Sequence, residues 1–294
     1  MRTFVLGDIH GNIKALKDVL KQVAFNYEED RLIFLGDVAD GWQWVPECIE
    51  EFMKIKNFIW CLGNHDKWTV SYFKSIQDQD NAGVAWFSAW EMRENSSTNL
   101  WLKQGGQVTF DAYENMRKND LENWEKHAKF WVNVPQLYHI EDKTLFVHGG
   151  VDWRMGIANQ PNNWIYYWDR DLWNRCIGLE HMKAGDVALV EHAPNKFMRN
   201  RKTVLEYAKE NDLPVITRVF IGHTVVDPRW NYTELVVPQK KAGVWNLDTG
   251  AGSTGNACLY YLEKGKYYLS KLVKDYYGDK MNDKILYKKY KYGK

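Results

Sequence analysis

Six short apolar runs in this sequence each end on a glycine-flanked group of carboxylate, imidazole or amide side chains. The six groups occupy residues 7–11, 36–41, 63–66, 148–150, 222–224 and 248–252. A single Gly-Asp pair or a lone histidine after a strand is ordinary turn chemistry. Six groups in order, all at strand ends, predict one site that is rich in oxygen and nitrogen donors. Because clustered carboxylates need a counter-charge to be stable, the pattern also predicts a bound cation.

The types of donor narrow the choice of cation. The groups contain Asp, His and Asn but no Cys, which suits manganese, iron, zinc, cobalt or nickel as a catalytic ion and does not suit structural zinc. There are enough donors for two divalent ions with a shared carboxylate. Two adjacent ions can activate a bridging water and hold the attacking and leaving oxygens of an in-line displacement. That chemistry belongs to phosphoester hydrolysis.

The apolar runs alternate with amphipathic segments, which predicts an α/β fold. In such folds ligands bind beyond the carboxyl ends of the strands, and this is where the polar groups lie. A first helix is expected after Asn12, a suitable N-cap, with apolar residues at helical spacing as far as Val23. A second helix is expected over residues 46–56, with proline near its first turn. Residues 257–273 have the pattern of a β-hairpin.

Two longer stretches, residues 67–136 and about 152–212, have mostly helical patterns. We expect both to be insertions that cover one face of a single catalytic domain spanning residues 1–273.

The 15 tryptophans and 17 tyrosines are expected mainly to fill the core. Residues 274–294 form a tail with seven Lys against three Asp and with interleaved tyrosines. Such a tail is a candidate contact for nucleic acid, but a solvated, partly docked terminal segment is the simpler interpretation.

Composition and charge exclude several classes of protein. The 294 residues are 45% hydrophobic and 26% charged, as in ordinary globular proteins. Lys and Arg total 39 against 38 Asp and Glu, so no overall charge favours nucleic acid or a membrane surface. No apolar run approaches the ~20 residues of a membrane span, and the first apolar run is too short for a signal peptide. We therefore expect a cytoplasmic protein whose four cysteines are buried free thiols.

The order of the motifs resembles that of the calcineurin-like metallophosphoesterases. Gly-Asp-x-His-Gly, Gly-Asp-x-x-Asp, Gly-Asn-His-Asp, His-Gly-Gly and Gly-His-Thr follow one another over residues 7–224. The pattern is most similar to the phosphoprotein-phosphatase branch, which includes bacterial and phage serine/threonine phosphatases and the symmetrical diadenosine tetraphosphatases. Residues 101–109 (Trp-Leu-Lys-Gln-Gly-Gly-Gln-Val-Thr) and 248–250 (Asp-Thr-Gly) resemble two further elements of that branch. The resemblance implies a four-layer α/β/β/α sandwich of two mixed sheets with a helical cap.

The resemblance also implies a role for each motif residue. The implied metal ligands are Asp8 and His10 for a first ion, Asp37 as the bridge, and Asn64, His148 and His223 for a second ion. His65 would protonate the leaving oxygen and Asp40 would orient His65. This assignment agrees with general chemistry, because a carboxylate partner fixes the tautomer of a histidine and favours its charged form.

The sequence departs from the branch at Gly41, where the branch has an arginine that clamps phosphate. A guanidinium grips two phosphoryl oxygens at once, so its loss bears on the choice of substrate. A second arginine is expected from the middle insertion. Arg175 lies in a Leu-Trp-x-Arg element similar to that of the branch, and Arg170 is the alternate. Arg175 and Asn64 are therefore the residues expected to bind the substrate phosphate.

These features predict a dinuclear phosphoesterase, with manganese as the expected metal, in which a metal-bridging hydroxide attacks phosphorus in line. The leading substrates are phosphomonoesters, including phosphoserine and phosphothreonine in a phosphoprotein. The alternative is a nucleotide enzyme that hydrolyses dinucleoside polyphosphates or phosphodiesters. The missing arginine and the tryptophan-rich insertions favour it, and Trp42 and Trp44 are candidates for a stacking wall. A binding module without turnover is disfavoured by the intact ligand set and the His65–Asp40 pair.

Overall fold

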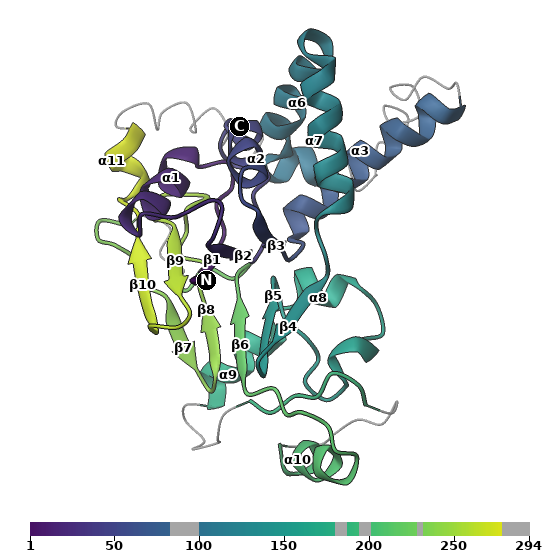
Figure 1. Cartoon of the computed structure of the whole chain (residues 1–294), viewed down its shortest axis with the longest axis vertical. Helices are drawn as coiled ribbons and strands as arrows, with labels where there is room; N and C mark the ends of the chain where they lie inside the picture. The colour runs from purple at the N-terminus through teal and green to yellow at the C-terminus, as the bar shows by residue number, and fades with distance from the viewer. Residues whose placement is uncertain (83–99, 180–186, 194–200, 228–231, 278–294) are drawn as a thin grey trace.

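The computed structural model describes residues 1–82, 100–179, 187–193, 201–227 and 232–277, and within these ranges two five-stranded sheets form the centre of the molecule (Figure 1). The first sheet has the order β10-β9-β1-β2-β3. Its strands, in that order, are Lys266–Leu269, Cys258–Tyr261, Thr3–Leu6, Arg31–Phe34 and Asn57–Trp60. β1, β2 and β3 are parallel, whereas β9 is antiparallel to both of its neighbours. The hairpin expected over residues 257–273 is the β9–β10 pair, so that prediction is confirmed.

The second sheet has the order β4-β5-β6-β8-β7. Its strands, in that order, are Tyr138–Glu141, Thr144–Val147, Arg218–Ile221, Val244–Asn246 and Gln239–Lys241. β5, β6 and β8 are parallel, and the outer strands β4 and β7 are antiparallel to their neighbours. Each sheet thus contributes three parallel strands, and the loops that follow those strands leave from the same edge of the sheet.

The two sheets pack face to face through one apolar layer. The layer contains Val5, Ile33 and Leu35 from the first sheet and its loops, and Phe146 and Phe220 from the second. These side chains alternate with residues that point to the outer face, as the two-residue period of a strand requires. On the outer face of the first sheet lie α1 (Ile13–Gln22) and α2 (Val45–Met53). On the second sheet α9 (Asp171–Leu179) packs against β7 and β8, which completes the predicted α/β/β/α sandwich.

The sequence places the helices near their observed bounds. Asn12 caps α1 by accepting a hydrogen bond from the backbone N–H of Ala15 at 3.1 Å, as expected. The second helix begins one residue earlier and ends three residues earlier than the expected 46–56, with Pro46 in its first turn. Over the expected stretch 67–136 the structure has the π-helical turn η1 (Leu102–Gly106), α6 (Gln107–Asn119), α7 (Leu121–Asn133) and most of α3 (Asn64–Ala82), which begins three residues earlier. Within residues 152–212 it has the 3₁₀ turn η2 (Ile157–Asn159), α8 (Trp164–Trp168), α9 and α10 (Arg201–Glu210).

Large aromatic side chains fill the core, as the composition predicts. Trp60, Trp101, Trp131 and Trp173 are at most 2% exposed.

All four cysteines are buried and free, which confirms the expectation of thiols rather than disulfides. Among the described helices, none is both long and apolar enough to cross a membrane. At the C-terminus a short helix, α11 (Val273–Tyr277), follows β10, and the remainder of the predicted tail lies outside the described residues.

We expect Phe220→Ala to lower the free energy of unfolding by about 3–5 kcal/mol, because it empties a fully buried position between the sheets. The ring of Phe220 stacks on that of Phe146 at 5.5 Å between centroids and lies 5.0 Å from that of Tyr260. Chemical denaturation measures the change. The matched control is Leu235→Ala, at a side chain 49% exposed, which should change stability by about 0.5 kcal/mol or less. Equal effects of the two substitutions would show that this layer is not the core.

Candidate metal centre and acid–base pair

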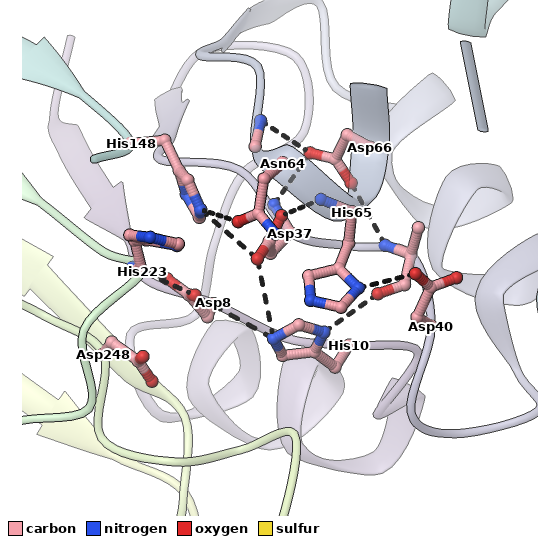
Figure 2. A network of polar contacts seen from close by, with 12 residues as sticks. Asp8, His10, Asp37, Asp40, Asn64, His65, Asp66, His148, His223 and Asp248 are labelled. Atoms are coloured by element: carbon pink, nitrogen blue, oxygen red, sulfur yellow. Dashed lines mark hydrogen bonds and ion pairs between the residues drawn. The ribbon is translucent and has the colours of Figure 1, made fainter. Parts of the chain in front are cut away.

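The polar groups that follow β1, β2, β3, β5 and β6 meet in one cluster at the carboxyl ends of those strands (Figure 2). The cluster brings together all six residues expected to bind metal, namely Asp8, His10, Asp37, Asn64, His148 and His223. Asp37 lies at its centre, between the rings of His10 and His148 (Figure 2). The side chain of His10 is 17% exposed, whereas that of Asp37 is only 3% exposed.

The ligand atoms fall into two groups that share one carboxylate. Asp8, His10 and Asp37 form the first group, and Asp37, His148 and His223 form the second. Within each group the ligand atoms lie within 4.8 Å of one another. Asn64 joins the second group, because its Oδ1 is 3.1 Å from Nε2 of His148. The geometry is that of two adjacent ion sites with Asp37 between them.

Backbone carbonyls fix the orientation of two of the imidazoles. Nδ1 of His10 is 2.9 Å from the carbonyl oxygen of Ala39, and Nδ1 of His148 is 2.9 Å from that of Leu35. A carbonyl accepts only from N–H, so each ring carries a proton on Nδ1, and Nε2 is the nitrogen that is available to bind a metal. These Nε2 atoms lie 3.8 Å and 3.2 Å from Oδ2 of Asp37. Both rings are therefore held in the tautomer that a metal ligand needs.

A bound cation would stabilise the buried carboxylates of the cluster. Burial, together with the charges of Asp248 and Asp37, raises the pKa of Asp8 well above its usual range. Burial likewise raises the pKa of Asp248 to about 6. Burial and the charge of His148 lower the pKa of His223, so this imidazole stays neutral, as a ligand must. Its Nε2 is buried and has no hydrogen-bond partner among the described residues. This oxygen and nitrogen donor set fits divalent ions of intermediate hardness.

The backbone of the cluster is bent where the side chains must turn inward. His10, Asp37, Asp40 and His223 all have positive φ, between 50° and 68°. Residues other than glycine adopt this conformation at a cost that the surrounding structure must offset, and such residues concentrate at functional sites. Gly222 shows how close the packing is, because a Cβ there would lie 2.1 Å from Oδ1 of Asp8.

Asp66 holds the loop that carries Asp37, a role that the sequence does not reveal. Its carboxylate accepts hydrogen bonds from the backbone N–H groups of residues 37, 38, 39 and 63, at 2.7–3.2 Å, and from Nε1 of Trp60 at 3.0 Å. Burial and the charge of Asp37 nonetheless raise the pKa of Asp66 to about 6. The only signal in the sequence is its place at the end of the Gly-Asn-His-Asp motif.

His65 and Asp40 form the predicted acid–base pair, with Nδ1 of His65 2.6 Å from Oδ2 of Asp40. Burial lowers the pKa of His65, but the charge of Asp37 and the hydrogen bond with Asp40 outweigh it and raise the pKa to about 9. The side chain of His65 is 17% exposed, so a substrate can reach it, whereas that of Asp40 is fully buried. The ring of His65 lies 5.0 Å from that of His10, which places the pair beside the first ligand group.

The glycine-rich element of residues 101–109 positions Asp40. Nε1 of Trp101 donates to both carboxylate oxygens at 2.9 Å, and Oγ1 of Thr109 donates to Oδ1 at 2.8 Å. Oγ1 of Thr109 also accepts from the backbone N–H of Asp40 at 2.9 Å. Gly105 bends the chain between them with φ of 113°, and a Cβ on Gly106 would lie 2.3 Å from Nε1 of Trp101. The spacing of this element therefore allows Trp101 and Thr109 to donate to the same carboxylate, that of Asp40.

Of the two candidate arginines, Arg170 rather than Arg175 has a charge that acts on the cluster. Arg175 lies on α9, with a guanidinium nitrogen 4.0 Å from Asp171 and the guanidinium carbon 5.9 Å from the centroid of the Trp153 ring. Arg170 precedes α9, and its charge contributes to the lowered pKa of His223, after burial and the charge of His148.

In the motif that lacks the arginine, Gly41 has a backbone conformation that favours glycine. Gly41 has φ of 81°, and a Cβ there would lie 3.1 Å from Cβ of His10, so any larger side chain would be strained. Trp42 is 6% exposed, and the ring of Tyr277 stacks on both Trp42 and Trp44. The expectation that Trp42 forms an open stacking wall is therefore wrong, because the C-terminal helix covers it.

The chain is similar to proteins of a known family. The sequence model for calcineurin-like phosphoesterases matches residues 1–227. A protein named bis(5'-nucleosyl)-tetraphosphatase, symmetrical, from Aliivibrio fischeri (strain MJ11) is 22% identical over 93% of this chain and 99% of its own length. A protein of the same name from Erwinia tasmaniensis is 37% identical, over 26% of this chain and 28% of its own length. A solved structure provisionally titled a diadenosine tetraphosphatase shares the fold, with a TM-score of 0.50 and 14% identity over 91% of this chain and 92% of that one.

We expect Asp66→Asn to weaken manganese binding by about 10–100-fold, because the loop that carries Asp37 loses its anchor. An amide presents N–H groups to backbone N–H donors that need an acceptor, so stability should also fall by about 2–4 kcal/mol. Calorimetric titration of the metal-free protein measures the first effect, and denaturation measures the second. Asp111→Asn, on the exposed face of α6, is the matched control and should change neither. Unaltered manganese binding in Asp66→Asn would contradict the assigned role.

Proposed function

Because the chain belongs to the calcineurin-like phosphoesterase family, we propose that the cluster around Asp37 is a two-metal centre that hydrolyses phosphoric ester or anhydride bonds. The observation that carries the proposal is the pair of ligand groups that share Asp37. Asp8, His10 and Asp37 would hold one divalent ion, and Asp37, Asn64, His148 and His223 the other. When bound, the ions supply the activated nucleophile and neutralise charge on the phosphoryl group. Manganese is the first candidate for both positions.

The residues of this chain then have distinct tasks. His65 donates a proton from Nε2 to the leaving oxygen, since its Nδ1 is held by Asp40. With a pKa of about 9, which the charge of Asp37 and the hydrogen bond with Asp40 raise against the effect of burial, His65 carries that proton at neutral pH. Arg170 and Asn64 bind the phosphoryl oxygens, and Arg170 replaces Arg175 in this assignment because its charge acts on the cluster.

For the substrate, we propose a dinucleoside polyphosphate or related nucleotide, with phosphomonoesters as the second candidate. Gly41 supports the choice: a terminal phosphate dianion gains most from a guanidinium clamp, and the backbone at this position disfavours one. The full-length similarity to a protein named as a tetraphosphatase gives further support. The ring of Trp68 lies 5.3 Å from that of His65, the expected proton donor, and an aromatic ring beside that residue suits a nucleobase.

A substrate panel with metal-stripped and manganese-reconstituted protein tests the proposal. The panel compares diadenosine tetraphosphate, nitrophenyl phosphate, bis-nitrophenyl phosphate and a phosphopeptide. We expect the stripped protein to be inactive, manganese to restore turnover, and kcat/KM for the tetraphosphate to exceed that for nitrophenyl phosphate by about 10–100-fold, the contribution of a charge-assisted clamp. Full activity without metal would overturn the metal centre. A phosphopeptide hydrolysed best would favour the second candidate.

We expect His65→Asn to lower kcat by about 10²–10⁴ on substrates with poor leaving groups, because these need a proton from the enzyme. The loss should shrink on nitrophenyl phosphate, whose leaving group departs without one. Asp40→Asn should have the same pattern but a smaller size, since Asp40 acts through His65. Steady-state kinetics across a series of leaving groups measures this dependence, and metal analysis checks that both ions remain. An equal loss on every substrate would instead assign His65 a structural or ligand role.

A further inference from the structure

The C-terminal helix α11 ends on a tyrosine whose ring is packed against two tryptophans. The centroid of the Tyr277 ring lies 4.8 Å from that of Trp42 and 4.8 Å from that of Trp44, with interplanar angles of 17° and 10°. Tyr277 is 7% exposed and Trp42 is 6% exposed, so the contact is closed to solvent. Trp42 and Trp44 come just after Asp40 and Gly41 in the sequence, so α11 lies against the second polar loop.

Tyr277 also reaches the first polar loop. Its hydroxyl donates to Oδ1 of Asn12 at 2.9 Å, in a buried hydrogen bond. Asn12 follows His10 and Gly11, and it caps α1. The two loops are joined to each other beneath the tyrosine, because the backbone N–H of Trp42 donates to the carbonyl of His10 at 2.9 Å.

A third loop meets the same point. Nε1 of Trp42 donates to the carbonyl of Ala251 at 3.0 Å. The next residue, Gly252, packs so closely on His10 that a Cβ there would lie 2.4 Å from Cδ2 of the imidazole. Tyr277 therefore packs where three loops from three different strands meet, and all three loops contact His10 or its neighbours.

Apart from Tyr277, the helix has further anchors on α1 and on the loop that carries Ala251 and Gly252. The hydroxyl of Tyr276 donates to Asp18 on α1, and Nζ of Lys14 donates to the carbonyl of Tyr276 at 3.0 Å. The backbone N–H of Val273 donates to the carbonyl of Gly255 at 2.9 Å. Adjacent residues of one helix thus have different contacts: Tyr276 binds the helix to α1, and Tyr277 contacts the loops that carry Asn12 and Trp42.

We propose that Tyr277 is a positioning residue of the metal centre, which fixes the loops of His10 and Asp40 through Trp42 and Asn12. The proposal rests on the two-metal centre proposed above. His10 and Asp40 both have the positive φ that a loop adopts only under constraint, with φ of 50° and 68°. Tyr277 supplies that constraint where Gly41 and Trp42 replace the Arg-Gly of the related motif. Its removal should act on the first ligand group through His10, and spare His148, His223 and the shared Asp37, whose loop Asp66 holds.

Manganese titration of the metal-free protein by calorimetry tests this without any substrate. We expect Tyr277→Ala to weaken one of two manganese sites by about 10–100-fold, as the loss of a group that orients a ligand does, and to leave the other within about threefold. Tyr277→Phe keeps the ring and loses the bond to Asn12, so a smaller loss at the same site, about 3–10-fold, is expected. Saturating manganese should restore kcat in both variants. Because bound metal also stabilises a weakened fold, the evidence for positioning is that one of the two sites is weakened while the other is kept.

Tyr276→Ala is the matched control, since it removes the same side chain from the neighbouring position of α11. Manganese affinities that match wild type in Tyr277→Ala, or that fall equally in Tyr276→Ala, would overturn the proposal. Should Tyr277→Ala not fold in a melting experiment, Tyr277→Phe decides alone, and wild-type affinity there overturns it. A wild-type protein that binds fewer than two ions would instead overturn the metal centre itself, which separates the two failures.

Discussion

Repulsion among buried carboxylates is the constraint on which the rest of this structure depends. Asp8, Asp37, Asp66 and Asp248 lie within one cluster and are all at most 4% exposed. Burial raises the pKa of Asp8, Asp66 and Asp248, and the charge of Asp37 adds to the rise in each. Only Asp37 has a lowered pKa, because the charges of His148 and His65 outweigh the effect of burial. Two divalent ions on either side of Asp37 would remove this repulsion, which explains why so costly an arrangement is kept.

Different carboxylates of the cluster have different tasks, so that some support the loops while others are available to bind the ions. Asp66 is neutralised by N–H donors and supports a loop, whereas the carboxylates of Asp8 and Asp37 remain turned toward the imidazoles. The same division applies to the acid–base pair, where Trp101 and Thr109 hold Asp40 so that Asp40 can hold His65. Each reacting group is thus oriented by a buried partner, which is how a site keeps its geometry without depending on flexible loops.

The residues that form the cluster could be predicted from the sequence because their signal is local. His148 follows a short apolar run directly, and Asp8 and Asp37 follow one after a single glycine; parallel strands bring such positions to one edge. The roles of Asp66 and Thr109 could not be predicted, since they depend on contacts with residues 29 and 69 positions away. The choice between the arginines stays a prediction: similarity to a short motif favours Arg175, whereas the charge of Arg170 acts on His223 and Asp248.

A crystal structure of the protein grown with manganese, with an anomalous difference map at the manganese edge, tests the central claim most directly. The account predicts two peaks, both within coordination distance of the Asp37 carboxylate, one beside Asp8 and His10 and the other beside His148 and His223. A single peak, or a second peak that does not touch Asp37, would contradict the shared carboxylate on which the whole arrangement rests.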